Sequence, residues 1–83
     1  MAKVVIYSKT YCPFCVRAKN LFSGKGVEFE EIMVDAKPEL FVELKEKTGM
    51  MTVPQIFIDD KLIGGFTELA ELDSKGGLDP LLA

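Results

Sequence analysis

Short apolar runs alternate with amphipathic segments along the whole chain. Residues 3–8 (KVVIYS) form a continuous run rich in β-branched residues, which is typical of a strand buried on both faces. Residues 12–26 then repeat apolar positions at helical spacing and contain two glycines suited to end a helix. Residues 27–34 (VEFEEIMV) are predicted to form a second strand. The first part of the chain is therefore a βαβ unit with parallel strands and a right-handed crossover.

The second half of the chain continues this alternation with shorter elements. Residues 37–49 are predicted to form a helix that opens with a proline, and residues 54–65 two antiparallel strands around an aspartate pair. Residues 67–77 are predicted to form a last helix, with Thr67 as its N-cap and a glycine pair at its end. The order β-α-β-α-β-β-α predicts an α/β fold, a four-stranded mixed sheet flanked by three helices.

Composition narrows the class of protein. With 83 residues, 48% of them hydrophobic and 28% charged, the chain is expected to form one globular domain, residues 1–83. Its net charge of −3 argues against nucleic acid or an anionic membrane as the main partner. No apolar run is long enough to span a bilayer, and the run at the N-terminus is too short for a signal peptide. We therefore expect a cytoplasmic protein.

The only two cysteines, Cys12 and Cys15, are spaced C-x-x-C, and the chain has no histidine. A Cys–His hydrolase is therefore excluded. Structural disulfides are rare in reducing cytosol, where a C-x-x-C pair is more often catalytic or metal-binding. A zinc site is disfavoured because closed structural zinc sites take four ligands, mostly cysteine and histidine. The pair therefore points to redox catalysis.

The predicted helix gives the two sulfurs different roles. Cys12 falls at the helix start, where free N–H groups and the helix dipole favour a thiolate, and Lys9 and Arg17 add positive charge nearby. Cys15 falls on the apolar stripe of the helix and should be more buried. We therefore expect Cys12 to attack a substrate disulfide, and Cys15 to resolve the resulting mixed disulfide.

Several motifs together resemble a known family. "YSKTYCPFC", "TVPQIFI", "IGGF" and the ending "GGLDPLL" follow the order and spacing of dithiol glutaredoxins, most nearly of the bacterial glutaredoxin 3 type. The resemblance implies a thioredoxin fold and a glutathione-dependent thiol–disulfide oxidoreductase. It also implies glutathione as the reducing co-substrate, glutathionylated or disulfide-containing proteins as partners, a monomer, and no metal.

The resemblance also implies a set of glutathione-binding residues: Lys9, Phe14, Thr52, Val53, Pro54, Gly65, Phe66 and Thr67. By itself, Pro54 would be predicted to open an edge strand through a trans bond, because only about 5–6% of X–Pro bonds in folded proteins are cis. The resemblance implies a cis bond that turns the backbone of Val53 toward Cys12, where it pairs with the cysteine of glutathione.

The remaining implied contacts concern the carboxylates of glutathione. Lys9 is expected to meet the glycyl carboxylate, and the N–H groups after Gly65 the γ-glutamyl carboxylate. Two positions depart from the family pattern. Thr67 stands where aspartate is common, which weakens a side-chain contact to the glutathione amine. Met50 stands where the glutaredoxin 3 type has arginine, so we expect either weaker glutathione binding or compensation by Lys9 and Lys47.

Two other functions fit the same motifs. One is a glutathione-ligated iron–sulfur cluster carrier, in which each of two chains gives only Cys12; Pro13 and Cys15 count against it. The other is a thioredoxin-like reductase fed by a flavoprotein, which the C-x-x-C does not exclude and the glutathione-site residues disfavour.

Overall fold

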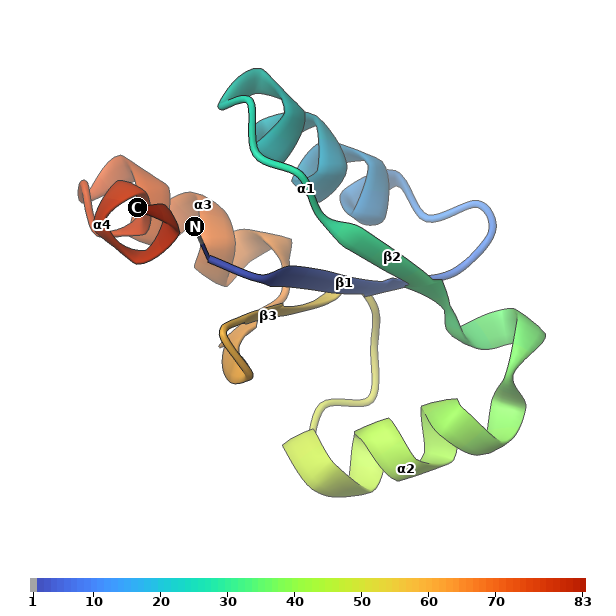
Figure 1. Ribbon diagram of the computed structural model, residues 1–83. Coiled ribbons are helices and arrows are strands. Elements are labelled where there is room, and N and C mark those ends of the chain that lie inside the picture. Colours follow the sequence, from blue (N-terminus) through green and yellow to red (C-terminus); the bar gives the residue numbers. More distant parts are fainter. Residues whose placement is uncertain (1) are drawn as a thin grey trace.

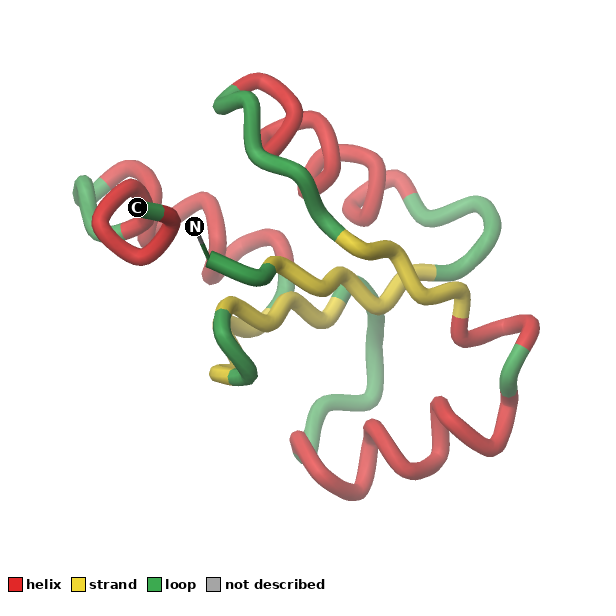
Figure 2. The backbone as a smooth tube through the Cα atoms, viewed as in Figure 1, coloured by secondary structure: helices red, strands yellow, loops and turns green. Residues whose placement is uncertain are grey.

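The computed structural model describes residues 2–83, which form a sheet with helices on both faces (Figures 1 and 2). In chain order the elements are β1 (Val4–Ser8), α1 (Pro13–Gly24), β2 (Glu30–Met33), the 3₁₀ helix η1 (Val34–Ala36), α2 (Pro38–Thr48), β3 (Gln55–Ile58), β4 (Lys61–Gly64), α3 (Phe66–Ser74) and α4 (Leu78–Leu82).

The sheet has the strand order β2-β1-β3-β4. Strands β1 and β2 run parallel, with Val5 opposite Glu30. Strand β3 runs antiparallel to both β1 and β4. The predicted four-stranded mixed sheet is thus confirmed, and its central strand β1 leads directly into the loop that carries the cysteines.

Each face of the sheet has its own apolar core. Alternate residues of β1 and β3, among them Ile6 and Ile56, pack with Ala18 and Phe22 of α1 and with buried leucines of α3 and α4. On the other face Phe57 packs with residues of η1 and α2. Figure 1 shows the result, with α1 and α2 on opposite sides of the sheet. Helix α1 is therefore fixed along its length, and its N-terminus is held over the end of β1.

The second strand is shorter than the sequence predicts. The prediction covered residues 27–34, whereas β2 contains only Glu30–Met33. The N–H of Val27 donates to the carbonyl of Phe22, 3.0 Å away, so this residue closes the end of α1 instead of joining the sheet. At the other end, Val34 begins η1 and is buried against α2.

The C-terminal region differs from the prediction in two respects. Helix α3 begins at Phe66 with Gly65 as its N-cap, so the prediction that Thr67 caps the helix is wrong. The sheet is also flanked by a fourth helix, α4, whereas the sequence predicted only three helices. Its Leu78 is fully buried, and Lys25 at the end of α1 lies 2.8 Å from Asp73 and from Asp79, which ties α1 to α3 and α4.

Candidate active site

The cysteine pair lies at the start of α1. Cys12 is the N-cap residue, with extended backbone angles, and Cys15 is in the first turn. The two form a disulfide, and the N–H of Cys15 donates to Sγ of Cys12 across 3.1 Å. Cys12 is 8% exposed and Cys15 only 1%, so both residues are largely buried and the one expected to attack is the less buried of the two.

The loop before Cys12 is held by a residue that sequence reasoning missed. The N–H of Thr10 donates to Oδ2 of Asp35 in η1, 3.0 Å away. This backbone hydrogen bond holds the pKa of the Asp35 carboxyl below its ordinary value of 3.8. Next to it, Tyr11 takes a left-handed conformation (φ 57°) and exposes its side chain. The carboxylate thus fixes the chain two residues before Cys12.

A second loop, residues 49–54, carries the chain from α2 to β3 (Figure 2). The Val53–Pro54 bond in this loop is cis, as the family resemblance implies. The carbonyl oxygen of Val53 lies 4.0 Å from Sγ of Cys12. Gln55, fully buried, donates from Nε2 to the carbonyls of Met50 and Thr52, each 3.1 Å away. Gln55 therefore holds this loop in place.

One pocket, of about 250 Å³, runs from this loop to the start of α3. It is lined by Phe14, Met50, Thr52, Val53, Pro54, Gly65, Phe66, Thr67 and Glu68. The structure thus brings together all the predicted glutathione-binding residues except Lys9. The rings of Phe14 and Phe66 lie 6.2 Å apart, centre to centre, and the guanidinium of Arg17 lies 5.1 Å from the centre of the Phe14 ring.

Lys9 lines a different pocket, of about 450 Å³, together with Tyr11, Val16, Lys19 and both cysteines. Both cysteines line this second pocket, whereas the pocket formed by the cis-proline loop and α3 is lined by Phe14, which lies between them in the sequence.

The start of α3 depends on two adjacent glycines. Gly64 has φ +125°, a conformation that favours glycine, and a Cβ there would lie 2.8 Å from Oε1 of Glu68. A Cβ on Gly65 would lie 3.4 Å from the carbonyl oxygen of Pro54, at the pocket wall. Oε1 of Glu68 accepts the N–H of Gly65 at 2.7 Å. Phe66 and Thr67 line the pocket, and their N–H groups, by their place in the first turn, have no intrahelical acceptor.

Glu68 is a second residue that sequence reasoning missed. A glutamate three residues after a helix N-cap is a known capping pattern, and the segment Gly65–Glu68 carries it. The prediction of Thr67 as N-cap displaced the helix start by two residues and so hid this pattern.

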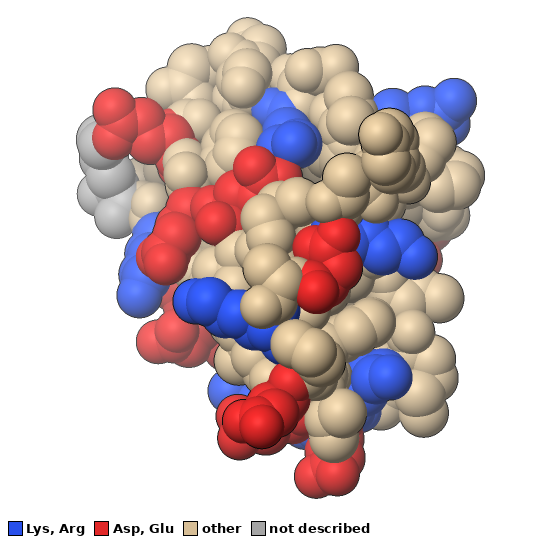
Figure 3. All heavy atoms as spheres, turned by 90° about the vertical axis from the view of Figure 1, so that its right-hand side faces the viewer, with Lys and Arg blue, Asp and Glu red and all other residues tan. Residues whose placement is uncertain are grey.

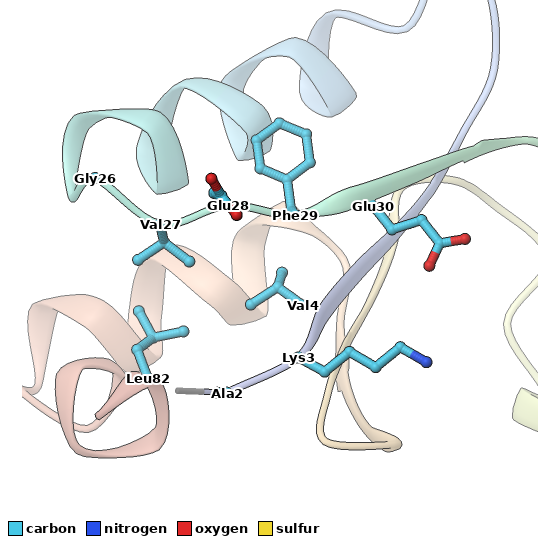
Figure 4. A pocket seen from close by; sticks show the side chains of 9 residues that line it. All are labelled: Ala2, Lys3, Val4, Gly26, Val27, Glu28, Phe29, Glu30 and Leu82. Carbon is cyan, nitrogen blue, oxygen red and sulfur yellow. The ribbon is translucent and has the colours of Figure 1, made fainter.

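A larger pocket, of about 620 Å³, lies at the N-terminal end of β1. It is formed by residues 2–4, residues 26–30 and Leu82 of α4. Figure 4 shows the side chains of Val27 and Leu82 pointing toward each other across it. It contains neither sulfur nor any predicted binding residue, so size does not identify the site here.

Acidic and basic side chains are interspersed on the face of the molecule shown in Figure 3. Within residues 2–83, no three histidine, cysteine, aspartate or glutamate side chains gather as metal ligands would. None of the helices described has the length and apolar character needed to cross a membrane.

Comparison with known proteins agrees with this geometry. The family model for glutaredoxin matches residues 4–63. Glutaredoxin 3 of Escherichia coli is 52% identical over 82 residues, which covers 99% of each chain. A glutaredoxin of Pseudomonas aeruginosa is 51% identical over 83 residues, covering all of this chain and 99% of that one.

Solved structures match as well. A buckwheat glutaredoxin–glutathione complex superimposes with a TM-score of 0.93 at 37% identity, covering 98% of this chain and 76% of that chain. The solution structure of a glutaredoxin from Brucella melitensis gives a TM-score of 0.88 at 48% identity, with coverages of 99% and 89%.

The chain therefore belongs to the glutaredoxin family, with the thioredoxin fold. It is a glutathione-dependent thiol–disulfide oxidoreductase, and the bonded pair Cys12–Cys15 fits a dithiol active site. The iron–sulfur carrier and the thioredoxin-like reductase are not favoured.

Proposed function

We propose that this protein reduces both glutathione mixed disulfides and protein disulfides, with Cys12 as the attacking sulfur and Cys15 as the resolving one. The observation that carries this proposal is the position of Cys12. Cys12 is the N-cap of α1 and the less buried of the two cysteines, and its Sγ lies 4.0 Å from the carbonyl oxygen of Val53 in the cis-proline loop. An incoming disulfide can reach it along the pocket beside that loop.

For a mixed disulfide, the Cys12 thiolate attacks the glutathione sulfur. The S–S bond of the substrate breaks, the protein thiolate leaves and takes a proton, and Cys12 becomes glutathionylated. A second glutathione thiolate then attacks the glutathione sulfur on Cys12. This step releases oxidised glutathione and restores the Cys12 thiolate, so Cys15 is not needed.

For a protein disulfide, Cys12 forms a mixed disulfide with the substrate and frees one substrate thiol. Cys15 then attacks Cys12, which frees the second substrate thiol and forms the disulfide seen here. Two glutathione molecules reduce that disulfide and become oxidised glutathione. The hydrogen-bonding distance between Sγ of Cys12 and the Cys15 amide shows how close the two residues are held.

The pocket of about 250 Å³ supports a glutathione site. The backbone of Val53, next to the cis bond, is suited to pair with the cysteine of glutathione as an added strand would. Phe14 and Phe66 form an apolar wall, while Thr52 and Pro54 shape the loop. Together these groups would direct the glutathione sulfur toward Cys12.

The ends of glutathione require charged partners. The first-turn N–H groups of α3, at Phe66 and Thr67 after Gly65, suit the γ-glutamyl carboxylate. The carboxylate of Glu68, which lines the same pocket, suits the adjacent amine and replaces the negative charge that Thr67 lacks. Lys9 lines the neighbouring pocket, so it would have to reach across the sulfur pair toward the glycyl carboxylate.

The same proposal includes the setting of the enzyme. We place it in the cytoplasm as a monomer, with residues 1–83 as one glutaredoxin domain and glutathionylated or disulfide-containing proteins as substrates. Reducing conditions there would keep the cysteine pair supplied with glutathione thiols.

The test compares two electron sources. The purified protein is given a glutathionylated peptide, or separately a disulfide-bonded protein, with either glutathione plus glutathione reductase or thioredoxin reductase, and NADPH consumption is followed. We expect rapid turnover with glutathione and little with thioredoxin reductase. Cys12→Ser, the matched control, should be inactive with both. Faster turnover with thioredoxin reductase would overturn the assignment.

A further inference from the structure

Ser8, the last residue of β1, carries a hydroxyl with no partner. Its side chain is fully buried, and its Oγ has no hydrogen-bond partner among the residues that the structure describes. Buried polar side chains nearly always have one, because leaving one unpaired costs the protein its full desolvation penalty. Such a group, next to the active-site loop, requires an explanation.

The register of the sheet places Ser8 beneath the cysteine pair. Side chains alternate along a strand, so Ser8 shares a face with Val4 and Ile6. That face packs against Ala18 and Phe22 of α1. Helix α1 runs back along β1 after a short loop, so its first turn lies over the end of that strand. Cys15 lies on the same buried stripe of α1, one turn before Ala18 and two turns before Phe22, which places it toward the end of β1 that carries Ser8.

Among the described residues, one other buried side-chain atom lacks a hydrogen-bond partner, and it does not pair with the Ser8 hydroxyl. Oε1 of Gln55 also lacks a partner, but Tyr7 pairs with Gln55 in the sheet, so Gln55 and Ser8 are not opposite each other. Gln55 and Phe57 share the face toward α2, whereas Ser8 faces α1. The sulfur of Cys15 is thus the polarisable group that the topology brings to the Ser8 hydroxyl.

We propose that Ser8 is a positioning residue for the reduced state, whose hydroxyl bonds to the Cys15 sulfur only after the disulfide opens. In the oxidised protein the Ser8 hydroxyl has no acceptor in hydrogen-bonding geometry among the described residues, and a disulfide sulfur has no proton to donate. A free thiol both donates and accepts weakly, and a thiolate accepts strongly. Ser8 therefore stabilises the dithiol relative to the disulfide and makes the pair a stronger oxidant.

The redox step is balanced by the reductant. When dithiothreitol or two glutathione thiols reduce the pair, the S–S bond between Cys12 and Cys15 breaks. The two electrons and two protons of the reductant appear in the two cysteine thiols, and the reductant forms its own disulfide. The contribution of Ser8 enters only as a difference in stability between the two forms.

This inference rests on the proposed redox function, so the test uses an equilibrium that does not depend on glutathione binding. Wild type and Ser8→Ala are equilibrated in dithiothreitol buffers of graded ratio, and the reduced fraction is read by thiol alkylation and mass spectrometry. We expect Ser8→Ala to lower the equilibrium constant for reduction about tenfold, the size of one hydrogen bond. A tenfold change corresponds to about 30 mV for this two-electron couple.

Two control variants separate this role from general packing. Ser8→Thr keeps the hydroxyl and should keep the wild-type equilibrium. Thr48→Val removes a hydroxyl that donates to Leu44 and accepts from Met50, away from the sulfurs, and should leave the redox equilibrium unchanged. An equilibrium constant for Ser8→Ala equal to that of wild type would overturn the proposal.

Thermal unfolding of both redox forms gives an independent readout. Ser8→Ala should lower the Tm of the reduced protein and leave that of the oxidised protein equal or higher. Equal losses in both forms would show a merely structural role and overturn the proposal. If glutathione turnover fails while these shifts appear, the glutathione site is wrong and the role of Ser8 stands.

Discussion

The N–H of Cys15 donates a hydrogen bond to Sγ of Cys12 across 3.1 Å. The bond occupies the place of an N-cap interaction, in which a side chain of the cap residue accepts a first-turn N–H of the helix. Once the disulfide opens, the same donor and the positive end of the helix dipole favour a negative charge on Cys12. Cys15 lies inside the turn and has no such position.

Selective alkylation follows from this arrangement. In the reduced protein, iodoacetamide should modify Cys12 at least about tenfold faster than Cys15 at neutral pH, because the thiolate is the reactive form. Rates are measured for each sulfur by peptide mass spectrometry between pH 4 and 9. Equal and slow rates at the two positions would contradict the stabilised thiolate.

The two cysteines should separate the two reactions. Cys12→Ser should abolish both deglutathionylation and protein disulfide reduction, because no attacking sulfur remains. Cys15→Ser should retain most deglutathionylation and lose protein disulfide reduction by roughly 10²-fold or more, since the mixed disulfide is no longer resolved. Both activities are assayed with glutathione and glutathione reductase. Equal loss of both in Cys15→Ser would refute the division of roles.

A methyl group at Gly65 should obstruct the pocket without unfolding the protein. Its Cβ would lie 3.3 Å from Oε1 of Glu68 and 3.4 Å from the carbonyl oxygen of Pro54, and the backbone there, with φ −90°, tolerates alanine. We expect KM for a glutathionylated peptide to rise roughly tenfold. Gly24→Ala is the control: a Cβ there meets nothing within 4 Å, and it should keep KM while stabilising α1 by up to about 1 kcal/mol. Unchanged kinetics in Gly65→Ala would remove this pocket from the glutathione site.

The bond between Asp35 and the Thr10 amide predicts a pH dependence of stability. Because that bond lowers the pKa of the Asp35 carboxyl below 3.8, the folded state favours the ionised form. The stability that the ionised Asp35 carboxylate gives the folded state is therefore complete above the unfolded pKa. It is lost as the pH falls through the lowered pKa of the folded state. Asp35→Asn keeps an acceptor oxygen and does not titrate.

At pH 6 to 7, Asp35→Asn should therefore lower the Tm by roughly 2–4 °C. The difference from wild type should shrink as the pH falls below 3.8 and through the lowered folded pKa, because the wild-type carboxyl then loses its charge. Melting curves monitored by circular dichroism at each pH provide the measurement. A Tm difference that stays constant down to pH 3 would show that the charge contributes nothing.

Local sequence signals determined the centre of the fold. The β-branched run of β1 and the apolar stripe of α1 are strong, short-range patterns, and Pro13 marks the first turn of a helix. Cys12 at the helix start was therefore predictable from neighbours within a few residues. The cis bond before Pro54 was not, because most such bonds are trans, and only the family resemblance indicated it.

The missed features depend on residues far apart in the chain. Asp35 contacts Thr10 across 25 positions, and no local pattern signals such a bond. Helix α4 has five residues, too few for an apolar period, and its Leu78 is placed by the core. The start of α3 was predicted two residues late because Thr67 is a good cap by composition, whereas the positive φ of Gly64 and the reach of Glu68 decide the observed start.

Glu68 offers a test of how the amine end of glutathione is held. Its Oε1 accepts the Gly65 N–H at 2.7 Å, and its side chain lines the pocket. Glu68→Gln keeps an acceptor oxygen for that bond, so the helix start and the Tm should persist. Only the negative charge is removed.

If the carboxylate attracts the glutathione amine, KM for a glutathionylated peptide should rise about threefold in Glu68→Gln with kcat unchanged, and the effect should weaken in high salt because exposed charges are screened. The matched control is Glu71→Gln, which removes another exposed carboxylate of α3, one that pairs with Lys75. This variant should keep the wild-type KM. A lower KM in Glu68→Gln would mean that the carboxylate repels the γ-glutamyl carboxylate instead. The first-turn N–H groups of α3 would then bind that carboxylate despite its repulsion by Glu68, and the glutathione amine would bind another group.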